Sequence, residues 1–258
     1  MTRPIHAIIL LAITLTSCEK YLEDPQYPTT LKILSTEEYS QLKESFALKN
    51  KYLKSSVNEF GFCDLTTTQS VDSPPLLDLN SEEETISIAK SFILKNPSET
   101  GINNPEDISI YSFSRNSIYG GAIRWVLKLS HQQIDTVEVM HSDCIIHITS
   151  REVTHCIGNW YPNIYIPSEF NLTQSKAKSA LIGKVVTHYS IGGEKYSYTI
   201  SKQNLANSHI HLKILPKVYE DKIELRICWQ IYVPDVSYIL YVDVMNGEIV
   251  NQEPTIIS

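Results

Sequence analysis

The strongest constraint on the fold is a change in hydrophobic periodicity that occurs twice along the chain. A stretch with helical spacing at residues 81–95 precedes short alternating segments that run from residue 108 to residue 157. The same order recurs after residue 171, where a helical stretch precedes alternating segments that reach residue 252. A period of about 3.6 favours a helix, and a period of two favours a strand. The predicted fold class is therefore α+β, with two tandem modules, each a helix packed on an antiparallel β-sheet.

Capping signals predict where the helices begin. Ser35 and Ser81 are each followed three residues later by a glutamate, which is the spacing of a capping box. The first signal predicts a helix at residues 35–54 and the second a helix at residues 81–95. The segment 171–174 predicts the start of a third helix, which precedes the second series of strands.

The clearest strand is predicted at residues 223–233, where every odd residue from Leu225 to Val233 is apolar. This alternation indicates a strand with one face on a core, and it places Trp229 in that core. Further along, Asn246-Gly247 predicts a type I′ hairpin turn, because both positions of that turn need positive φ. Asp243 precedes the turn and is expected to stabilise it through side-chain hydrogen bonds.

The N-terminus has the pattern of an export signal. Arg3 is followed by an apolar stretch at residues 7–15, which is too short to cross a membrane as a helix. Leu15-Thr16-Ser17-Cys18 resembles the lipobox of bacterial lipoproteins, in which the cysteine sulfur takes a diacylglycerol. The resemblance implies that Cys18 is lipidated, so that the chain is anchored to a bacterial membrane in the cell envelope. An ordinary signal peptide with a chance cysteine is the alternative.

Four segments follow from these patterns: a signal peptide at 1–17, a tether at 18–79, a first module at 80–165 and a second module at 166–258. The tether is expected because Pro25 and Pro28 stand among polar residues and Pro74-Pro75 interrupts the pattern. Whether the helix predicted near residue 35 packs as an extra element or stands in a solvated stalk is left open.

Composition excludes several classes of function. The chain has 258 residues, of which 42% are hydrophobic and 20% charged, and this composition is enough for a buried core rather than disorder. Its net charge of −7 argues against a nucleic-acid partner.

Four cysteines follow Cys18: Cys63, Cys144, Cys156 and Cys228. A three-residue hairpin loop at 149–151 would place Cys144 directly opposite Cys156, near enough for a disulfide. A two-residue loop would break that register. A disulfide and two buried thiols are both consistent with the sequence.

No catalytic constellation is visible, so the chain is predicted not to be an enzyme and to need no cofactor. The strongest metal candidate is His209-Ile210-His211, which puts two imidazoles on one face of a strand. Further ligands cannot be named, so a solvent-exposed strand is the preferred interpretation and no metal site is predicted. The chain has no Gly-x-Ser-x-Gly, no glycine-rich phosphate loop and no His-Glu-x-x-His.

The two modules resemble a known family of propeptides. The first is similar to the FTP module of thermolysin-like metalloprotease propeptides in residues 92–96, Gly101-Ile102, 125–129, Gln132-Gln133, 145–153 and 158–162. The second is similar to a PepSY module in residues 172–181, 225–233 and 241–250. The chain departs from the pattern at Ile134-Asp135-Thr136, in what looks like an insertion at 186–210, and in the absence of a protease after the modules.

The resemblance implies a non-enzymatic lipoprotein that binds or inhibits an extracytoplasmic protease, as the related propeptides do in cis. An antiparallel sheet edge could pair with an extended segment of such a partner, although the sequence does not identify the edge. The alternative is a cell-envelope interaction protein that binds peptide, glycan or another envelope component.

Overall fold

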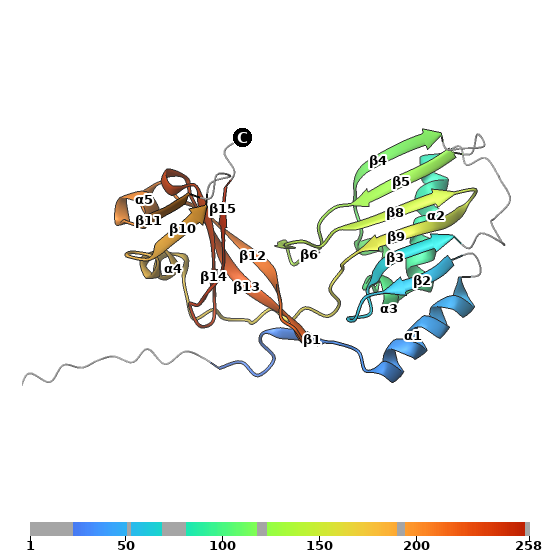
Figure 1. Ribbon diagram of the computed structural model, residues 1–258, viewed down its shortest axis with the longest axis horizontal. Coiled ribbons are helices and arrows are strands. Elements are labelled where there is room, and N and C mark those ends of the chain that lie inside the picture. Colours follow the sequence, from blue (N-terminus) through green and yellow to red (C-terminus); the bar gives the residue numbers. More distant parts are fainter. Residues whose placement is uncertain (1–22, 51–52, 69–80, 118–122, 190–193, 256–258) are drawn as a thin grey trace, which may run out of the picture.

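The computed structural model describes residues 23–50, 53–68, 81–117, 123–189 and 194–255, which form two units (Figure 1). Each unit consists of a largely antiparallel sheet with helices on one face, so the predicted α+β class with two helix-on-sheet modules is confirmed. Each helix within the described residues falls short of the length and hydropathy of a membrane span. The predicted signal peptide and Cys18 lie outside the described residues.

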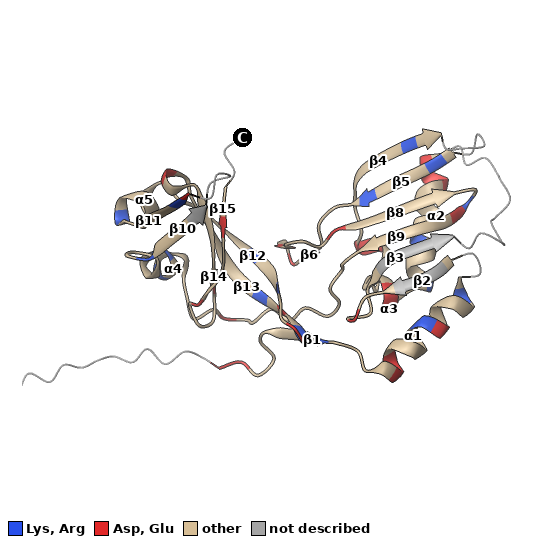
Figure 2. Cartoon of the chain, viewed as in Figure 1, with Lys and Arg blue, Asp and Glu red and all other residues tan. Residues whose placement is uncertain are grey.

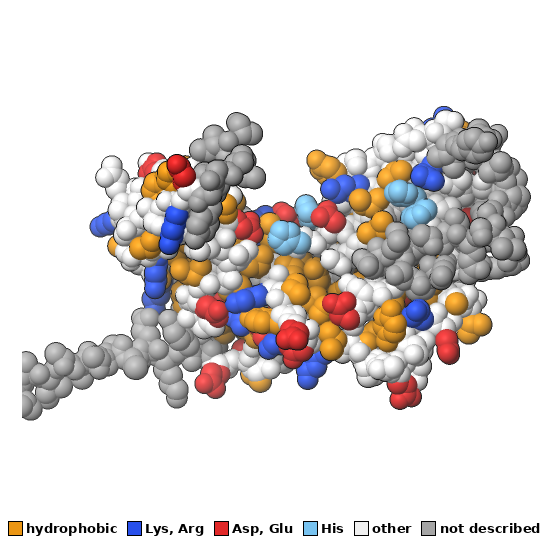
Figure 3. Space-filling model, viewed as in Figure 1, with side chains coloured by type: hydrophobic (Ala, Val, Ile, Leu, Met, Phe, Trp, Pro, Cys, Tyr) orange, Lys and Arg blue, Asp and Glu red, His pale blue; other side chains and the backbone are white. Residues whose placement is uncertain are grey.

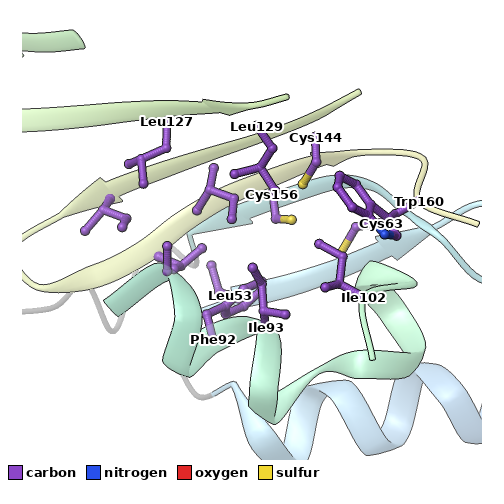
Figure 4. Close-up of a cluster of buried hydrophobic side chains, with 14 of the residues drawn as sticks. Leu53, Cys63, Phe92, Ile93, Ile102, Leu127, Leu129, Cys144, Cys156 and Trp160 are labelled. Carbon is purple, nitrogen blue, oxygen red and sulfur yellow. The ribbon is translucent and has the colours of Figure 1, made fainter. Parts of the chain in front are cut away.

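In the first unit, a helix lies across a sheet with the strand order β4-β5-β8-β9. The elements are α2 (Glu82–Lys95), β4 (Ile110–Ser117), β5 (Ile123–Leu129), β8 (Cys144–Thr149) and β9 (Glu152–Gly158). The Ser81 hydroxyl accepts a hydrogen bond from the Glu84 N–H and starts α2 where the sequence predicted. Buried side chains of the helix and strands then form one core, to which Phe92, Ile93, Trp125, Leu127 and Ile146 belong (Figure 4).

The segment before α2 adds three elements to this unit: α1 (Thr36–Lys49), β2 (Leu53–Val57) and β3 (Cys63–Thr68). Ser35 and Glu38 form the predicted capping box at the start of α1. The hairpin of β2 and β3 lies beside β9, and Phe46, Leu53 and Cys63 are buried in the same core. Of the expected tether, α1, β2 and β3 thus pack on the first unit, which decides the open question of the helix near residue 35 in favour of a packed element.

A pair of asparagines joins the ends of the two long helices. The side-chain N–H of Asn50 donates to Asn96 Oδ1 at 2.7 Å, and that of Asn96 donates to Asn50 Oδ1 at 3.3 Å. Each amide also bonds the carbonyl four residues earlier in its own helix, which satisfies a helix-end acceptor. Beyond this joint, a short helix α3 (Pro97–Thr100) and a 3₁₀ turn (Pro105–Asp107) lead into β4.

The second unit is a seven-stranded sheet with the order β15-β14-β13-β12-β7-β6, in which β1 also pairs with β13. The strands are β1 (Thr29–Lys32), β6 (Gln133–Ile134), β7 (Val137–Val139), β12 (His209–Val218), β13 (Lys222–Val233), β14 (Tyr238–Asp243) and β15 (Ile249–Pro254). Strand β13 is central, since β12 pairs along one of its sides while β1 and β14 share the other. A 3₁₀ turn (Pro234–Val236) connects β13 to β14.

Smaller elements cover one face of this sheet: α4 (Gln174–Ala180), β10 (Val185–Tyr189), β11 (Lys195–Thr199) and α5 (Lys202–Ala206). Ala177, Val186 and Leu205 from this layer pack with Ile231 and Val233, which belong to the predicted apolar set of β13. Trp229 is partly buried on the same face, where its indole N–H donates to the Leu172 carbonyl at 2.9 Å, so its predicted place in the core is confirmed.

The second unit's sheet takes strands from outside the predicted second module. Strand β7, from the segment assigned to the first module, pairs in parallel with β12, and Lys213 Nζ lies 2.7 Å from Glu138 Oε2 across this pair. Strand β1, from the expected tether, pairs with β13. In the chain, the first unit lies between β1 and β12, and β6 and β7 interrupt it between β5 and β8 (Figure 1).

The structure decides one hairpin prediction and corrects another. Ser150 and Arg151 both have positive φ and form the two-residue loop between β8 and β9, which is one of the two alternatives that the sequence left open. In the other hairpin, Gly247 has positive φ and Asn246 does not. Its turn spans four residues and is closed by hydrogen bonds between Asp243 and the backbone of Gly247 and Glu248, so it is not a type I′ turn.

Candidate functional site

The histidine pair considered for metal binding lies on an exposed side of β12. His209 and His211 are both exposed, and the His209 ring stacks on Tyr232 with centroids 6.2 Å apart. Across the described ranges, no three side chains of His, Cys, Asp or Glu are arranged to hold a metal ion. The pair therefore offers two ligands on an open surface and no built site.

Asp243 lies fully buried at the centre of a hydrogen-bonded cluster. Its Oδ1 accepts the N–H groups of Met245 at 2.8 Å and Asn246 at 3.2 Å, which confirms the predicted turn-stabilising role. Its Oδ2 accepts the Tyr27 hydroxyl at 2.8 Å and Arg226 Nη1 at 3.0 Å. Four donors use the acceptor positions of the carboxylate. The cluster can therefore lock the structure, but it offers no acceptor to a ligand.

Two further carboxylates extend this cluster through Arg226. Arg226 also pairs with Glu224 at 2.7 Å and with Glu248 at 3.4 Å. Burial alone would lower the pKa of Arg226, but the bond to Glu224 and the charge of Asp243 raise it overall. Burial, and then the charge of Asp243, raise the pKa of Tyr27. Sequence reasoning missed Tyr27 and Arg226, since no local pattern relates them to Asp243.

The feature most open to a partner is the outer edge of β4. No described strand pairs with this edge, and β4 is eight residues long. Proteins usually protect such edges by charge, proline or shortness. Here the charged residue, Arg115, is directed back over the ring of Trp125 at 5.4 Å. The two ends of the second unit's strand order are protected, because β15 has a bulge and ends at Pro254, while β6 has two residues.

A hollow of about 300 Å³ lies near the start of β4 and the end of β5. Its lining combines apolar, basic and acidic side chains: Tyr111, Lys128, Leu129, Ser130, His131, Gln133 and Glu138. Tyr111 is 74% exposed, and Lys128 Nζ lies 5.7 Å from its ring centroid. Figure 3 shows the surface notched between the two units, and acidic and basic residues are interspersed over both (Figure 2). The open edge of β4 together with this hollow is the candidate site.

Cys63, Cys144, Cys156 and Cys228 are all buried. Strand pairing places Cys144 opposite Gly158 and Cys156 opposite Ile146, so the predicted pair Cys144 and Cys156 is diagonal rather than directly opposite. The register on which that disulfide depended is therefore wrong, because the loop has two residues and a bulge follows His147.

The resemblance to the FTP module rested partly on residues that prove to be in contact. Gln132 is buried, and its side chain bonds the backbone of Tyr161 twice, donating to the carbonyl at 2.7 Å and accepting from the N–H at 3.0 Å. Gly101 has a φ of +73°, and a Cβ there would lie 1.9 Å from the Trp160 carbonyl oxygen. These contacts explain why glutamine and glycine occupy these positions.

Comparisons with known proteins give little guidance. No family model matches the chain, and no curated protein matches its sequence. Among solved structures, the chain is similar to the Bacillus megaterium YpeB C-terminal domain, with 10% identity and a TM-score of 0.34. That similarity covers 87% of this chain and 99% of the other. The α+β class rests on the observed elements, and the relation to FTP and PepSY modules stays a prediction.

Proposed function

We propose that the chain is a non-enzymatic, membrane-anchored binding protein that inhibits an extracytoplasmic protease by pairing β4 with an extended segment of that protease. The observation that carries the proposal is the unprotected edge of β4 beside the hollow near Tyr111. An extended segment would gain main-chain hydrogen bonds along the edge, and one of its side chains would enter the hollow. Inhibition follows when the captured segment borders the protease active site, because the two units then exclude substrate.

Attachment through Cys18 would hold this edge near a membrane. Only eight residues lie between Cys18 and Tyr27, whose hydroxyl is fixed by Asp243. These nine residue steps would hold Tyr27 within about 30 Å of the lipid. Confinement of the chain at a membrane would raise the local concentration of the binding edge, which favours a weak contact with a partner at the same surface. A second acyl chain would make such anchoring stable.

Inhibition of a metalloprotease secreted by the same organism tests the binding proposal. Lysine at Ser114 and Asn116, both exposed on β4, should weaken stoichiometric inhibition at least tenfold, since edge lysines oppose strand addition. The control adds lysine at Gln41 and Ala47, both exposed on α1, and should leave inhibition unchanged. Equal inhibition by the two double variants would contradict a β4 site. Binding without inhibition would favour the cell-envelope interaction protein instead.

Two further measurements test anchoring and the absence of turnover. Cys18→Ala should release the protein from membranes or leave an unprocessed precursor, and unchanged lipid-free protein in both forms would refute lipidation. Metal-dependent hydrolysis by the purified chain, abolished by His209→Ala with His211→Ala, would overturn the non-enzymatic proposal. Inhibition that survives this double change is the expected result.

A further inference from the structure

Three thiols meet in the core of the first unit. Cys63 comes from β3, Cys144 from β8 and Cys156 from β9, and each is at most 3% exposed. The Cys144 and Cys63 side chains both raise the pKa of the Cys156 thiol, and all three belong to one buried cluster. Figure 4 shows the three sulfur atoms gathered beside Trp160 and Ile102. The fourth buried cysteine, Cys228, belongs to a separate cluster in the second unit.

The two neighbours of Cys156 differ in geometry. Cys144 lies diagonally across the β8–β9 ladder, because its direct partner is Gly158. Diagonal Cα atoms in an antiparallel pair are about 7–8 Å apart, whereas disulfides need about 4.4–6.8 Å. Cys63 is not held in that ladder, since β3 pairs with β2 and lies alongside β9.

We propose that Cys63 and Cys156 form a disulfide that fastens the β2–β3 hairpin to the sheet of the first unit, with Cys144 left as a free thiol. The bond would close a loop of roughly 90 residues, a length for which the entropic stabilisation is large. It would also hold β3, which precedes α2 in the chain, against β9 of the same unit.

The bond must form during folding, because all three thiols are shielded once β3 packs against β9. A disulfide oxidant such as oxidised glutathione is the co-reactant. The Cys156 thiolate attacks one glutathione sulfur and releases one reduced glutathione. The Cys63 thiolate then attacks the Cys156 sulfur of the mixed disulfide and releases the second. Two protein thiols are oxidised while one oxidised glutathione becomes two reduced molecules.

Oxidative refolding of the full chain carrying Cys18→Ser tests this without reference to export or to a partner. After refolding with a glutathione redox pair, peptide mapping without reductant should give one cross-linked peptide that contains Cys63 and Cys156. Alkylation in denaturant should then label Cys144 and Cys228 alone. The bridged form should melt roughly 10 °C above the reduced form.

Matched variants separate the three thiols. Cys144→Ser and Cys228→Ser should both keep the cross-link, whereas Cys63→Ser should abolish it together with the difference in Tm. A cross-link between Cys144 and Cys156, or four labelled thiols in the refolded native chain, would overturn the proposal. Failure of the inhibition assay would leave this result unaffected, since the refolding experiment uses no protease.

Discussion

Removal of the Tyr27 hydroxyl should loosen the N-terminal segment from the second unit. The hydroxyl donates to Asp243 at 2.8 Å and accepts the Ile227 N–H at 3.0 Å. Tyr27→Phe loses a bond to a charged acceptor, worth about 1.5–3 kcal/mol, and leaves a part-buried N–H unpaired. We expect a total loss of about 2–4 kcal/mol in the free energy of unfolding. Asp243→Asn removes a buried charge beside Arg226 and should cost about 3–5 kcal/mol.

The double variant Tyr27→Phe with Asp243→Asn tests whether the two side chains interact. Both single changes break the same Tyr27–Asp243 bond, so their combined cost should be smaller than the sum by about 1–2 kcal/mol. Urea unfolding followed by tryptophan fluorescence measures this coupling when Trp229 is the sole tryptophan, which requires Trp125→Phe and Trp160→Phe in every form. Trp229 lies in the second unit and reports on the sheet that holds the cluster. Strict additivity would show that the two side chains do not interact.

Other changes test the first unit and the turns. Gly101→Ala should lower the free energy of unfolding by more than about 4 kcal/mol, and Gly183→Ala by about 1–2 kcal/mol. Both glycines have positive φ, but only a Cβ at Gly101 would meet a backbone atom within 4 Å. Thermal melts compare the two variants. Gln132→Ala should lower the free energy of unfolding, measured in urea, by about 2–4 kcal/mol. A loss below about 0.5 kcal/mol would contradict the two buried hydrogen bonds from its side chain to Tyr161. Burial, with nearby positive charge, lowers the pKa of His147 and His155 below 6.5. The unfolded chain then binds more protons, so this contribution to stability is present above pH 6.5 and is lost as pH falls towards the folded pKa. Glutamine at both positions should flatten that pH dependence, and an unchanged slope would refute the assignment.

The sequence predicted the elements whose cause is local. Helix starts at Ser35 and Ser81 follow from a hydroxyl and the backbone three residues later, and these contacts occur as expected. The turn role of Asp243 also depends on neighbours two and three residues away. Strand β13 was predicted because its alternating apolar residues indicate one buried face.

The rest depends on distant partners. Strands β1 and β2 are short and largely polar, so neither shows a clear alternation, and each is identified only by the strand beside it. The Cys144–Cys156 register stayed open because Ser150 and Arg151 take positive φ without glycine, which the sequence does not signal. The candidate edge could not be predicted either, since β4 is an outer strand only by virtue of the sheet order.

The pairing of β1 with β13 has a consequence for the order in which the chain folds. Thr29 lies opposite Leu225, so β1 leaves the ribosome roughly 190 residues before its partner, which at about 5–20 residues per second is about 10–40 s. During that interval the whole first unit is synthesised, and its core is complete without β1. The earliest strand of the molecule is therefore among the last to find its place. A chain truncated before residue 222 would carry a finished first unit and a strand with no sheet to join.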